Sequence, residues 1–351
     1  MRACVLTGTG GPIADNLEIT DVPDAPVPQA GEVRVAIRPA ALNHLDLFVA
    51  DGLPGGADRF PHVVGADGAG VVESVGPDVK TVKLGDRVML NPGISDYTCE
   101  FCRAGEHSLC VNYRLLGEHL PGTMAQLVTL PAHNVVRMPA LSPELTWAEA
   151  AAFSLVTLTA WRMVVTRAQL RAGETVLIWG IGGGVSLAAL RIAKLLGARA
   201  IVTSSHDAKL TEARRLGADV TINHRTQKVS QEVRSVTQKR GVEVVIENVG
   251  EATWDESLRC LKRGGRLVTC GATSGPQVGM DLRRVFWHHY TIMGSTMGNA
   301  REYAEIVRRL GAGELRPIVD QVFPMTDARK AYERLAKGEQ LGKVVVEVVS
   351  G

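Results

Sequence analysis

Residues 175–198 read TVLIWGIGGGVSLAALRIAKLLGA, and this segment is the most informative one about the architecture of the chain. It opens with an apolar run at 176–179, which is typical of a strand buried on both faces of a sheet. The turn that follows contains Gly180, Gly182, Gly183, Gly184 and Val185. Glycines at such a turn let the backbone approach a pyrophosphate closely, and the N-terminus of the next helix attracts its negative charge. Glycine turns also join ordinary strands to helices, but this context predicts a dinucleotide site.

Strands and helices alternate from this stretch to about residue 295. The predicted strands are 175–179, 199–204, 219–223, 242–249, 266–271 and 290–295, and the predicted helices between them are 185–196, 208–216, 229–239 and 254–261. Six strands with short crossovers form a complete doubly wound parallel sheet of the Rossmann type. The fold class is therefore α/β in this part of the chain.

The remainder of the chain has a different character. Short alternating runs such as 32–37 and 70–75, punctuated by Gly and Pro, predict a β-rich, irregular domain. After the sixth strand we expect a helix at 301–311 and a last strand at 343–349, too little for a third domain. The expected parts are a first domain at 1–157, the Rossmann unit at 158–297 and a segment at 298–351 that returns to the first domain. The Rossmann unit is then an insertion, and we expect a cleft between the two lobes.

Composition narrows the class of partner. Lys and Arg number 39 against 37 Asp and Glu, and no block of one charge occurs, which argues against nucleic acid or an anionic membrane. We find no apolar run of membrane-spanning length and no signal-peptide pattern at the start. Six cysteines in 351 residues do not form a disulfide scaffold, which favours a reducing, cytoplasmic setting. A small-molecule substrate is the expected partner.

One loop carries a pattern of metal ligands. The segment DYTCEFCRAGEHSLC places Asp96, Cys99, Cys102 and Cys110 close together in the sequence. Three thiolates and a carboxylate suit a closed tetrahedral zinc site, which would be structural because no position is left for water. The alternatives are three free thiols with Asp96 on the surface, or a different fourth ligand. Candidates for that ligand are Glu100, Glu106 and His107.

Together these features resemble the medium-chain dehydrogenase/reductase superfamily over essentially the whole chain. The segments that carry the resemblance are PHVVGADGAGVVESVG (61–76), LGDRV (84–88), NPGIS (91–95), AAAFSLVTLTAW (150–161) and GKVVV (342–346). The resemblance implies a GroES-like catalytic domain with a structural zinc lobe at about 91–112. It also implies an enzyme that uses NADH or NADPH, and a homodimer or homotetramer paired through the edge strand of the cofactor domain.

The zinc-dependent alcohol dehydrogenases of this superfamily hold a catalytic ion with two cysteines and a histidine. The positions that match those ligands here are Asn43, Ala66 and Leu155. Alanine and leucine offer no lone pair, and a catalytic zinc needs about three protein ligands. We therefore expect no catalytic zinc. The proton-relay serine of those enzymes corresponds to Leu45, so that relay is missing too.

What remains resembles the zinc-independent quinone oxidoreductases and the enoyl or 2-alkenal reductases. These carry Asn beside the nicotinamide and Asp a few residues on, and their glycine turn is one residue longer, as 180–186 is here. The resemblance gives Asn43, His44, Asp46 and Thr159 as catalytic candidates. Asp46 is expected to orient the loop rather than transfer protons. His44 could equally contact a phosphate or simply pack in the loop.

The residues at the end of the second predicted strand indicate whether the cofactor is NADPH or NADH. NAD-binding folds usually place an acid there, whereas this chain has Ser204, so nothing repels a 2′-phosphate. Lys209 and His224 match phosphate contacts of NADPH-dependent quinone reductases. We therefore favour NADPH, with NADH as the alternative in which Asp207 binds the ribose. The remaining expected cofactor contacts are Ser205, Asn248, Gly271, Ala272, Ser295, Met297 and Lys343.

The resulting hypothesis is hydride transfer from NADPH to an activated C=C bond or a quinone. Such acceptors delocalise charge onto oxygen and depend less on a Lewis acid than a simple ketone does. One alternative is a metal-independent alcohol dehydrogenase or carbonyl reductase acting on an aldehyde or ketone. Another is a protein that binds the cofactor without catalysis.

Overall fold

The computed structural model describes residues 1–141 and 143–348, and it divides into two compact units. Unit 1 comprises Met1–Leu155 together with the chain from Asn299 onward, and unit 2 comprises Val156–Gly298. The sequence placed these divisions after residues 157 and 297, within two residues of where the structure divides.

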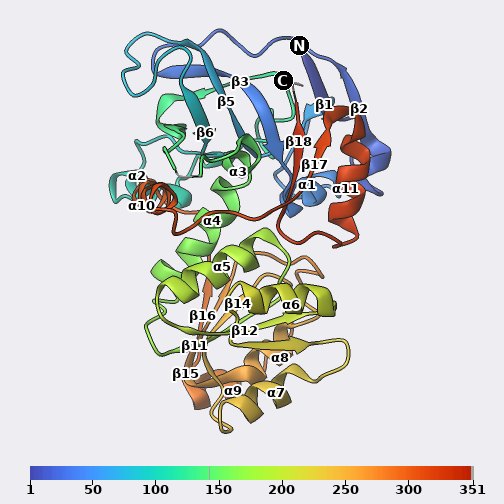
Figure 1. Ribbon diagram of the computed structural model, residues 1–351, viewed down its shortest axis with the longest axis vertical. Coiled ribbons are helices and arrows are strands. Elements are labelled where there is room, and N and C mark those ends of the chain that lie inside the picture. Colours follow the sequence, from blue (N-terminus) through green and yellow to red (C-terminus); the bar gives the residue numbers. More distant parts are fainter. Residues whose placement is uncertain (142, 349–351) are drawn as a thin grey trace. The chain divides into compact units, whose positions relative to one another are not determined.

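Unit 1 is built on a seven-stranded sheet with the strand order β10-β6-β5-β3-β18-β17, in which β9 also pairs with β3. Its strands are β3 (Glu32–Ala41), β5 (Asp67–Val75), β6 (Arg87–Leu90), β9 (Leu127–Pro131), β10 (Val135–Arg137), β17 (Val319–Pro324) and β18 (Lys343–Glu347). The C-terminal strand β18 pairs with β3 antiparallel, Val345 opposite Ala41. The red strands β17 and β18 thus continue a sheet begun by the blue β3 (Figure 1).

Smaller elements surround this sheet. The strands are β1 (Arg2–Leu6), β2 (Leu17–Asp21), β4 (His62–Val63), β7 (Gly93–Ile94) and β8 (Arg114–Leu115). The helices are α1 (His44–Ala50), α2 (Glu100–Arg103), α3 (Trp147–Ala151), α10 (Ala300–Gly311) and α11 (Ala328–Ala336), with short 3-10 turns η1 (Ile13–Asn16), η2 (His107–Leu109), η3 (Ala132–Asn134) and η5 (Met325–Asp327). Alternation in β3 sends Val33, Val35 and Ile37 into the core, where α11 adds the fully buried Tyr332.

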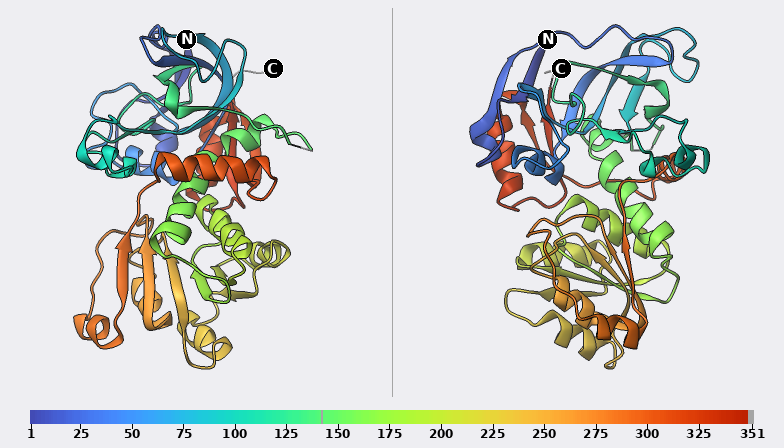
Figure 2. Two further views of the ribbon diagram at one scale, coloured as in Figure 1. Left: turned by 90° about the vertical axis from the view of Figure 1, so that its left-hand side faces the viewer. Right: turned by 180° about the vertical axis from the view of Figure 1, so that it is seen from behind.

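Unit 2 is a parallel sheet of six strands in the order β13-β12-β11-β14-β15-β16, which confirms the predicted Rossmann-type fold class (Figures 1 and 2). The strands are β11 (Thr175–Ile178), β12 (Arg199–Ser204), β13 (Val220–Asn223), β14 (Val242–Glu247), β15 (Leu261–Thr269) and β16 (Thr291–Gly294). The helical segments are α4 (Ser154–Trp161), which starts just before the division, the π-helical turn η4 (Arg162–Arg167), α5 (Gly184–Leu195), α6 (Asp207–Arg215), α7 (Val229–Val236), α8 (Trp254–Cys260) and α9 (Leu282–His288).

Some elements differ from the sequence prediction. β15 starts at Leu261 rather than at residue 266, because Leu261 pairs with Val242 before the ladder resumes at Arg266. α9, β17 and α11 were not predicted at all. The last predicted strand, 343–349, ends in the structure at Glu347, and residue 349 lies outside the described residues. In the ranges that the structure describes, no helix combines the length and the apolar character needed to cross a membrane.

Candidate active site

The loop after β3 places three of the predicted catalytic residues at the start of α1. Asn43 is the N-cap of this helix, and its backbone N–H donates to Asp46 Oδ2 at 2.9 Å. The Tyr332 hydroxyl, from α11, donates to the same oxygen at 3.2 Å. Asp46 is buried, and burial raises the pKa of its carboxyl to about 6. These hydrogen bonds tie Asp46 to the start of α1 and to α11, and its role in orienting the loop stays a prediction.

An ion pair that the sequence analysis did not foresee lies beside Asn43. Lys343 Nζ, at the start of β18, is 3.0 Å from Asp67 Oδ2, at the start of β5. The lysine side chain is 4% exposed and the aspartate 0%. The Asn43 amide joins both partners, because its Oδ1 accepts from Lys343 Nζ at 2.5 Å and its Nδ2 donates to Asp67 Oδ2 at 3.1 Å. A buried pair of charges is tolerable here because each partner is hydrogen-bonded.

This network occupies the positions where a catalytic zinc would have its ligands. The second oxygen of Asp67, Oδ1, accepts from the backbone N–H of Leu155 at 2.9 Å, and Ala66 precedes Asp67 in the chain. The side chain of Asn43 and the backbone of Leu155 therefore both bind one carboxylate, whose charge the Lys343 ammonium balances. Among the described residues, the one cluster of His, Cys, Asp and Glu with metal-ligand spacing lies elsewhere, in the cysteine loop. The residues present here do not fit a catalytic metal.

His44 lies next to this network and is half-buried. Burial lowers the pKa of its imidazole, and the positive charge of Lys343 lowers it further. The ring is therefore neutral near pH 7 and can donate one hydrogen bond and accept another. Its assignment as a catalytic group stays a prediction.

The predicted glycine turn joins β11 to α5 in unit 2. Gly180 and Gly182 have φ values of +64° and +130°, which favour glycine, and α5 begins at Gly184. Ser186 is buried; its hydroxyl donates to Trp179 O at 2.8 Å and accepts from Asn248 Nδ2 at 3.0 Å. The first N–H groups of α5 have no partner within the helix, so the turn fits a pyrophosphate.

The other predicted contacts in unit 2 follow the carboxyl ends of neighbouring strands. Asn248 follows β14, Gly271 and Ala272 follow β15, and Ser295 and Met297 follow β16. Ser295 Oγ is buried and has no hydrogen-bond partner in the described part of the chain, and its assignment as a cofactor contact stays a prediction. Thr159, on α4, donates its hydroxyl to Met297 Sδ at 3.6 Å.

At the predicted ribose end, Ser204 closes β12 and its hydroxyl accepts from His206 N at 3.2 Å. Asp207 Oδ1 accepts from Asn223 Nδ2 at 2.7 Å, so one oxygen of the possible NAD ligand already has a partner. His224 follows β13 with its ring 6.2 Å from that of Trp179. Burial lowers the pKa of this histidine. Ser205 and Lys209 lie at the same edge, after β12 and on α6.

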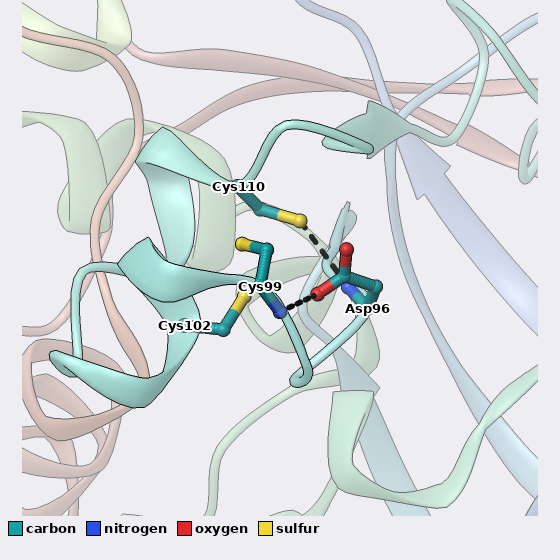
Figure 3. A group of neighbouring side chains, drawn as sticks. All are labelled: Asp96, Cys99, Cys102 and Cys110. Carbon is teal, nitrogen blue, oxygen red and sulfur yellow. Dashed lines mark hydrogen bonds between the residues drawn. The ribbon is translucent and has the colours of Figure 1, made fainter.

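The cysteine loop brings its predicted ligands together (Figure 3). One ligand atom from each of Asp96, Cys99, Cys102 and Cys110 lies within 4.8 Å of the others. Asp96 Oδ1 accepts from the N–H groups of Thr98 and Cys99, at 2.8 and 3.0 Å, and these bonds lower the pKa of its carboxyl. The three sulfurs and the carboxylate fit a closed site in which a zinc ion has tetrahedral coordination. Of the alternative fourth ligands, His107 instead accepts from the backbone N–H of Ala300 through its Nδ1, at 3.3 Å.

Comparison with known proteins agrees with this architecture. The family model for the alcohol dehydrogenase GroES-like domain matches residues 29–140, and the model for zinc-binding dehydrogenases matches residues 184–312. A zinc-type alcohol dehydrogenase-like protein of Schizosaccharomyces pombe is 33% identical over 91% of both chains. An acryloyl-coenzyme A reductase of Metallosphaera sedula is 30% identical over 99% of both chains. A crystal structure of an NAD-dependent alcohol dehydrogenase superposes with a TM-score of 0.93 at 41% identity, covering 99% of this chain and 100% of that one.

The chain belongs to the medium-chain dehydrogenase/reductase superfamily. It is an enzyme, an oxidoreductase that depends on NAD(H) or NADP(H). Its relatives include both alcohol dehydrogenases and reductases of unsaturated coenzyme A thioesters, so membership alone does not choose the reaction.

Proposed function

We propose that the enzyme transfers hydride from NADPH to an activated C=C bond or a quinone, without a catalytic metal. The observation that carries this proposal is the network of Lys343, Asp67 and Asn43 at the positions of the absent zinc ligands. Reduction of a simple ketone would lack a Lewis acid, which contributes several kcal/mol to such reactions. A conjugated acceptor spreads the developing charge onto its oxygen, where hydrogen-bond donors suffice.

The residues of unit 1 have separate parts in this proposal. Asn43 is held on both sides, since its Oδ1 accepts from Lys343 and its Nδ2 donates to Asp67, so its amide cannot rotate freely. Lys343 and Asp67 act as positioning residues for that amide. The neutral His44 is the donor that we assign to the substrate oxygen. The bound nicotinamide supplies the hydride.

We favour NADPH because Ser204 stands where NAD-binding chains usually carry an acid. One carboxylate oxygen of the nearby Asp207 already accepts a hydrogen bond from Asn223, so this carboxylate is less able to bind two ribose hydroxyls. Lys209 and His224 are the groups that we assign to the 2′-phosphate. For the cysteine loop we propose one structural zinc per chain, held by three thiolates and Asp96.

The relatives bear on the substrate in two directions. The acryloyl-coenzyme A reductases, one of them 30% identical, support an activated C=C bond as the acceptor. The NAD-dependent alcohol dehydrogenases, one of them 31% identical, favour the second candidate, a carbonyl reductase or alcohol dehydrogenase that works without a metal. A cofactor binder without catalysis finds no support among them.

A substrate panel separates the two candidates. The purified enzyme would be assayed with enones, enoyl thioesters, quinones, aldehydes and secondary alcohols, each with NADPH and with NADH. Our proposal expects turnover of at least one conjugated acceptor with NADPH, and a lower rate with the matched saturated aldehyde. Turnover of aldehydes or alcohols with no reduction of any conjugated acceptor would favour the second candidate.

We also propose a homodimer formed through β16, with a homotetramer as the larger alternative. β16 is the last strand in the sheet order, so one of its sides has no neighbouring strand in the part of the chain that the structure describes. The adjacent α9 exposes large apolar side chains: Leu282 is 66% exposed, Phe286 64% and Trp287 66%. Pairing of two copies would cover both features.

A further inference from the structure

Unit 2 has a pocket that lies away from the glycine turn. Its volume is about 470 Å³, which is in the range of small-molecule sites. The residues that line it are Arg234, Lys239, Arg240, Leu261, Lys262, Arg263, His288 and Tyr290. Five of these carry a fixed positive charge, one is a histidine, and none is acidic.

The topology explains why these residues meet. Because β14, β15 and β16 are parallel, the three segments that enter them lie at one edge of the sheet, the amino edge. Arg234, Lys239 and Arg240 come from the end of α7 and the turn before β14, Leu261–Arg263 open β15, and His288 and Tyr290 precede β16. The cofactor turn lies at the carboxyl edge, about 25 Å away along a nine-residue strand such as β15. The two sites are therefore distinct.

The positive charge in this pocket is only partly balanced. Among the described residues, Glu243 is the one carboxylate that forms ion pairs with the lining residues, at 2.8 Å from Lys262 and 3.5 Å from Arg240. Arg234 donates to the backbone carbonyls of Lys239 and Arg259, at 3.0 and 3.1 Å, which fixes its guanidinium but leaves its charge unpaired. For Lys239 and Arg263 the described residues provide no ion pair at all.

Two ring-bearing residues on the pocket wall, His288 and Tyr290, add a polar atom without a partner to these unpaired charges. His288 and Tyr290 lie with their ring centroids 5.4 Å apart, and His288 Nδ1 is buried without a hydrogen-bond partner among the described residues. Burial lowers the pKa of His288, and so do the positive charges of Arg263, Arg284 and Arg234. Of these three, Arg284 is paired, with Asp255 at 2.9 Å. The pocket thus holds unpaired cations and an unsatisfied ring nitrogen.

We propose that this pocket binds a small, multiply charged phosphate anion, of the size of a diphosphate group. Several cations without acidic partners favour an anion with more than one charge, and the guanidinium groups suit phosphate oxygens. A long polyanion such as nucleic acid is disfavoured, because the whole chain carries a net charge of only +2 and the cations are gathered in one small pocket. This site is separate from the hydride-transfer site and does not depend on the proposed reaction.

Isothermal titration calorimetry of the full-length enzyme with inorganic pyrophosphate tests the proposal. A saturating concentration of NADP⁺, repeated with NAD⁺, keeps the cofactor site filled, so that pyrophosphate cannot bind there. We expect one pyrophosphate per chain, with binding at least tenfold weaker at 0.3 M NaCl than at 0.03 M, because the contacts are electrostatic. A parallel titration with ADP distinguishes a nucleotide diphosphate from the free anion as the preferred source of the group.

Variants locate the site. The double substitution Lys239→Gln and Arg263→Gln should weaken pyrophosphate binding at least tenfold, because it removes two of the three lining cations that have no ion pair among the described residues. Arg214→Gln, on the exposed face of α6, is the matched control and should leave binding unchanged. The wild type, the double variant and the Arg214→Gln control should have the same reductase activity and the same melting temperature. Absence of saturable binding to the dinucleotide-saturated enzyme, or equal binding by the double variant, would overturn the proposal.

Discussion

At the scale of single residues, the central feature is the buried ion pair of Lys343 and Asp67. Removal of one partner from such a pair leaves an uncompensated buried charge, which typically costs about 3–5 kcal/mol. We predict that Lys343→Met lowers the unfolding free energy by this amount, as measured by urea denaturation. Lys337→Met, on an exposed lysine of the same unit, is the control and should change it by less than about 0.5 kcal/mol.

The same pair gives a second readout. Combining Lys343→Met with Asp67→Asn removes both charges, so the double variant should recover part of the lost stability. Equal destabilisation of the double and the single variant would show that the lysine matters for packing rather than for charge.

The raised pKa of Asp46 predicts that the stability of the folded chain depends on pH. Burial raises the pKa of its carboxyl from 3.8 to about 6 in the folded chain, so the folded state binds the proton more tightly than the unfolded state does. The protonated Asp46 carboxyl therefore makes its full contribution to the free energy of unfolding below about pH 4. This contribution is lost as the pH rises through about 6, and the total loss is up to about 3 kcal/mol. Asp46→Asn cannot titrate. Between pH 4 and 7 the wild type should lose stability relative to this variant, and a constant difference would refute the assignment.

The sequence was informative about some of these residues and not about others. The resemblance to the zinc-dependent alcohol dehydrogenases identified the positions of Asn43, Ala66 and Leu155, and side-chain chemistry alone shows that alanine and leucine offer zinc no lone pair. The partners Asp67, Tyr332 and the buried ammonium of Lys343 come from strands and a helix far apart in the chain, and single-sequence patterns do not report such contacts. One signal was available: Asp67 directly follows Ala66 within an otherwise small and apolar segment.

At the scale of elements, strongly patterned segments were predictable and weakly patterned ones were not. β12 has the predicted bounds, and α10 starts one residue before the predicted helix, because an apolar strand and an amphipathic helix have distinct periods. β17 was missed because its burial is only partial and Pro324 ends it. α11 was missed although Ala328, Ala331, Tyr332 and Leu335 recur at helical spacing. α9 buries no residue and so leaves no apolar stripe.

The glycine turn predicts the effect of a single methyl group. Gly182 has a φ of +130°, a conformation that L-residues rarely adopt, so Gly182→Ala should displace the turn. We predict that NADPH binding weakens at least tenfold, as followed by the fluorescence of the bound nicotinamide. Gly279→Ala, at a position with ordinary φ and open space around it, is the control and should bind as the wild type does. Normal binding by the Gly182 variant would place the cofactor elsewhere.

At the scale of the whole molecule, the exposed apolar residues of α9 predict self-association. Replacing Phe286 and Trp287 with lysine puts charges into the proposed interface, where their desolvation is costly. We expect the wild type to elute as a dimer or tetramer in size exclusion with light scattering, and the double variant to dissociate. The exposed Leu84 of unit 1 is the control site, and Leu84→Lys should leave the oligomer intact. A monomeric wild type would contradict the proposal.

The zinc content of the purified enzyme shows directly whether the chain holds a structural ion alone or a catalytic ion as well. One zinc per chain is expected, bound in the cysteine loop, because the network around Lys343 has no ligand set for a second ion. A Cys99→Ser, Cys102→Ser variant measured alongside should contain none. Two zinc ions per chain, or one zinc that remains after the loop cysteines are removed, would contradict the account.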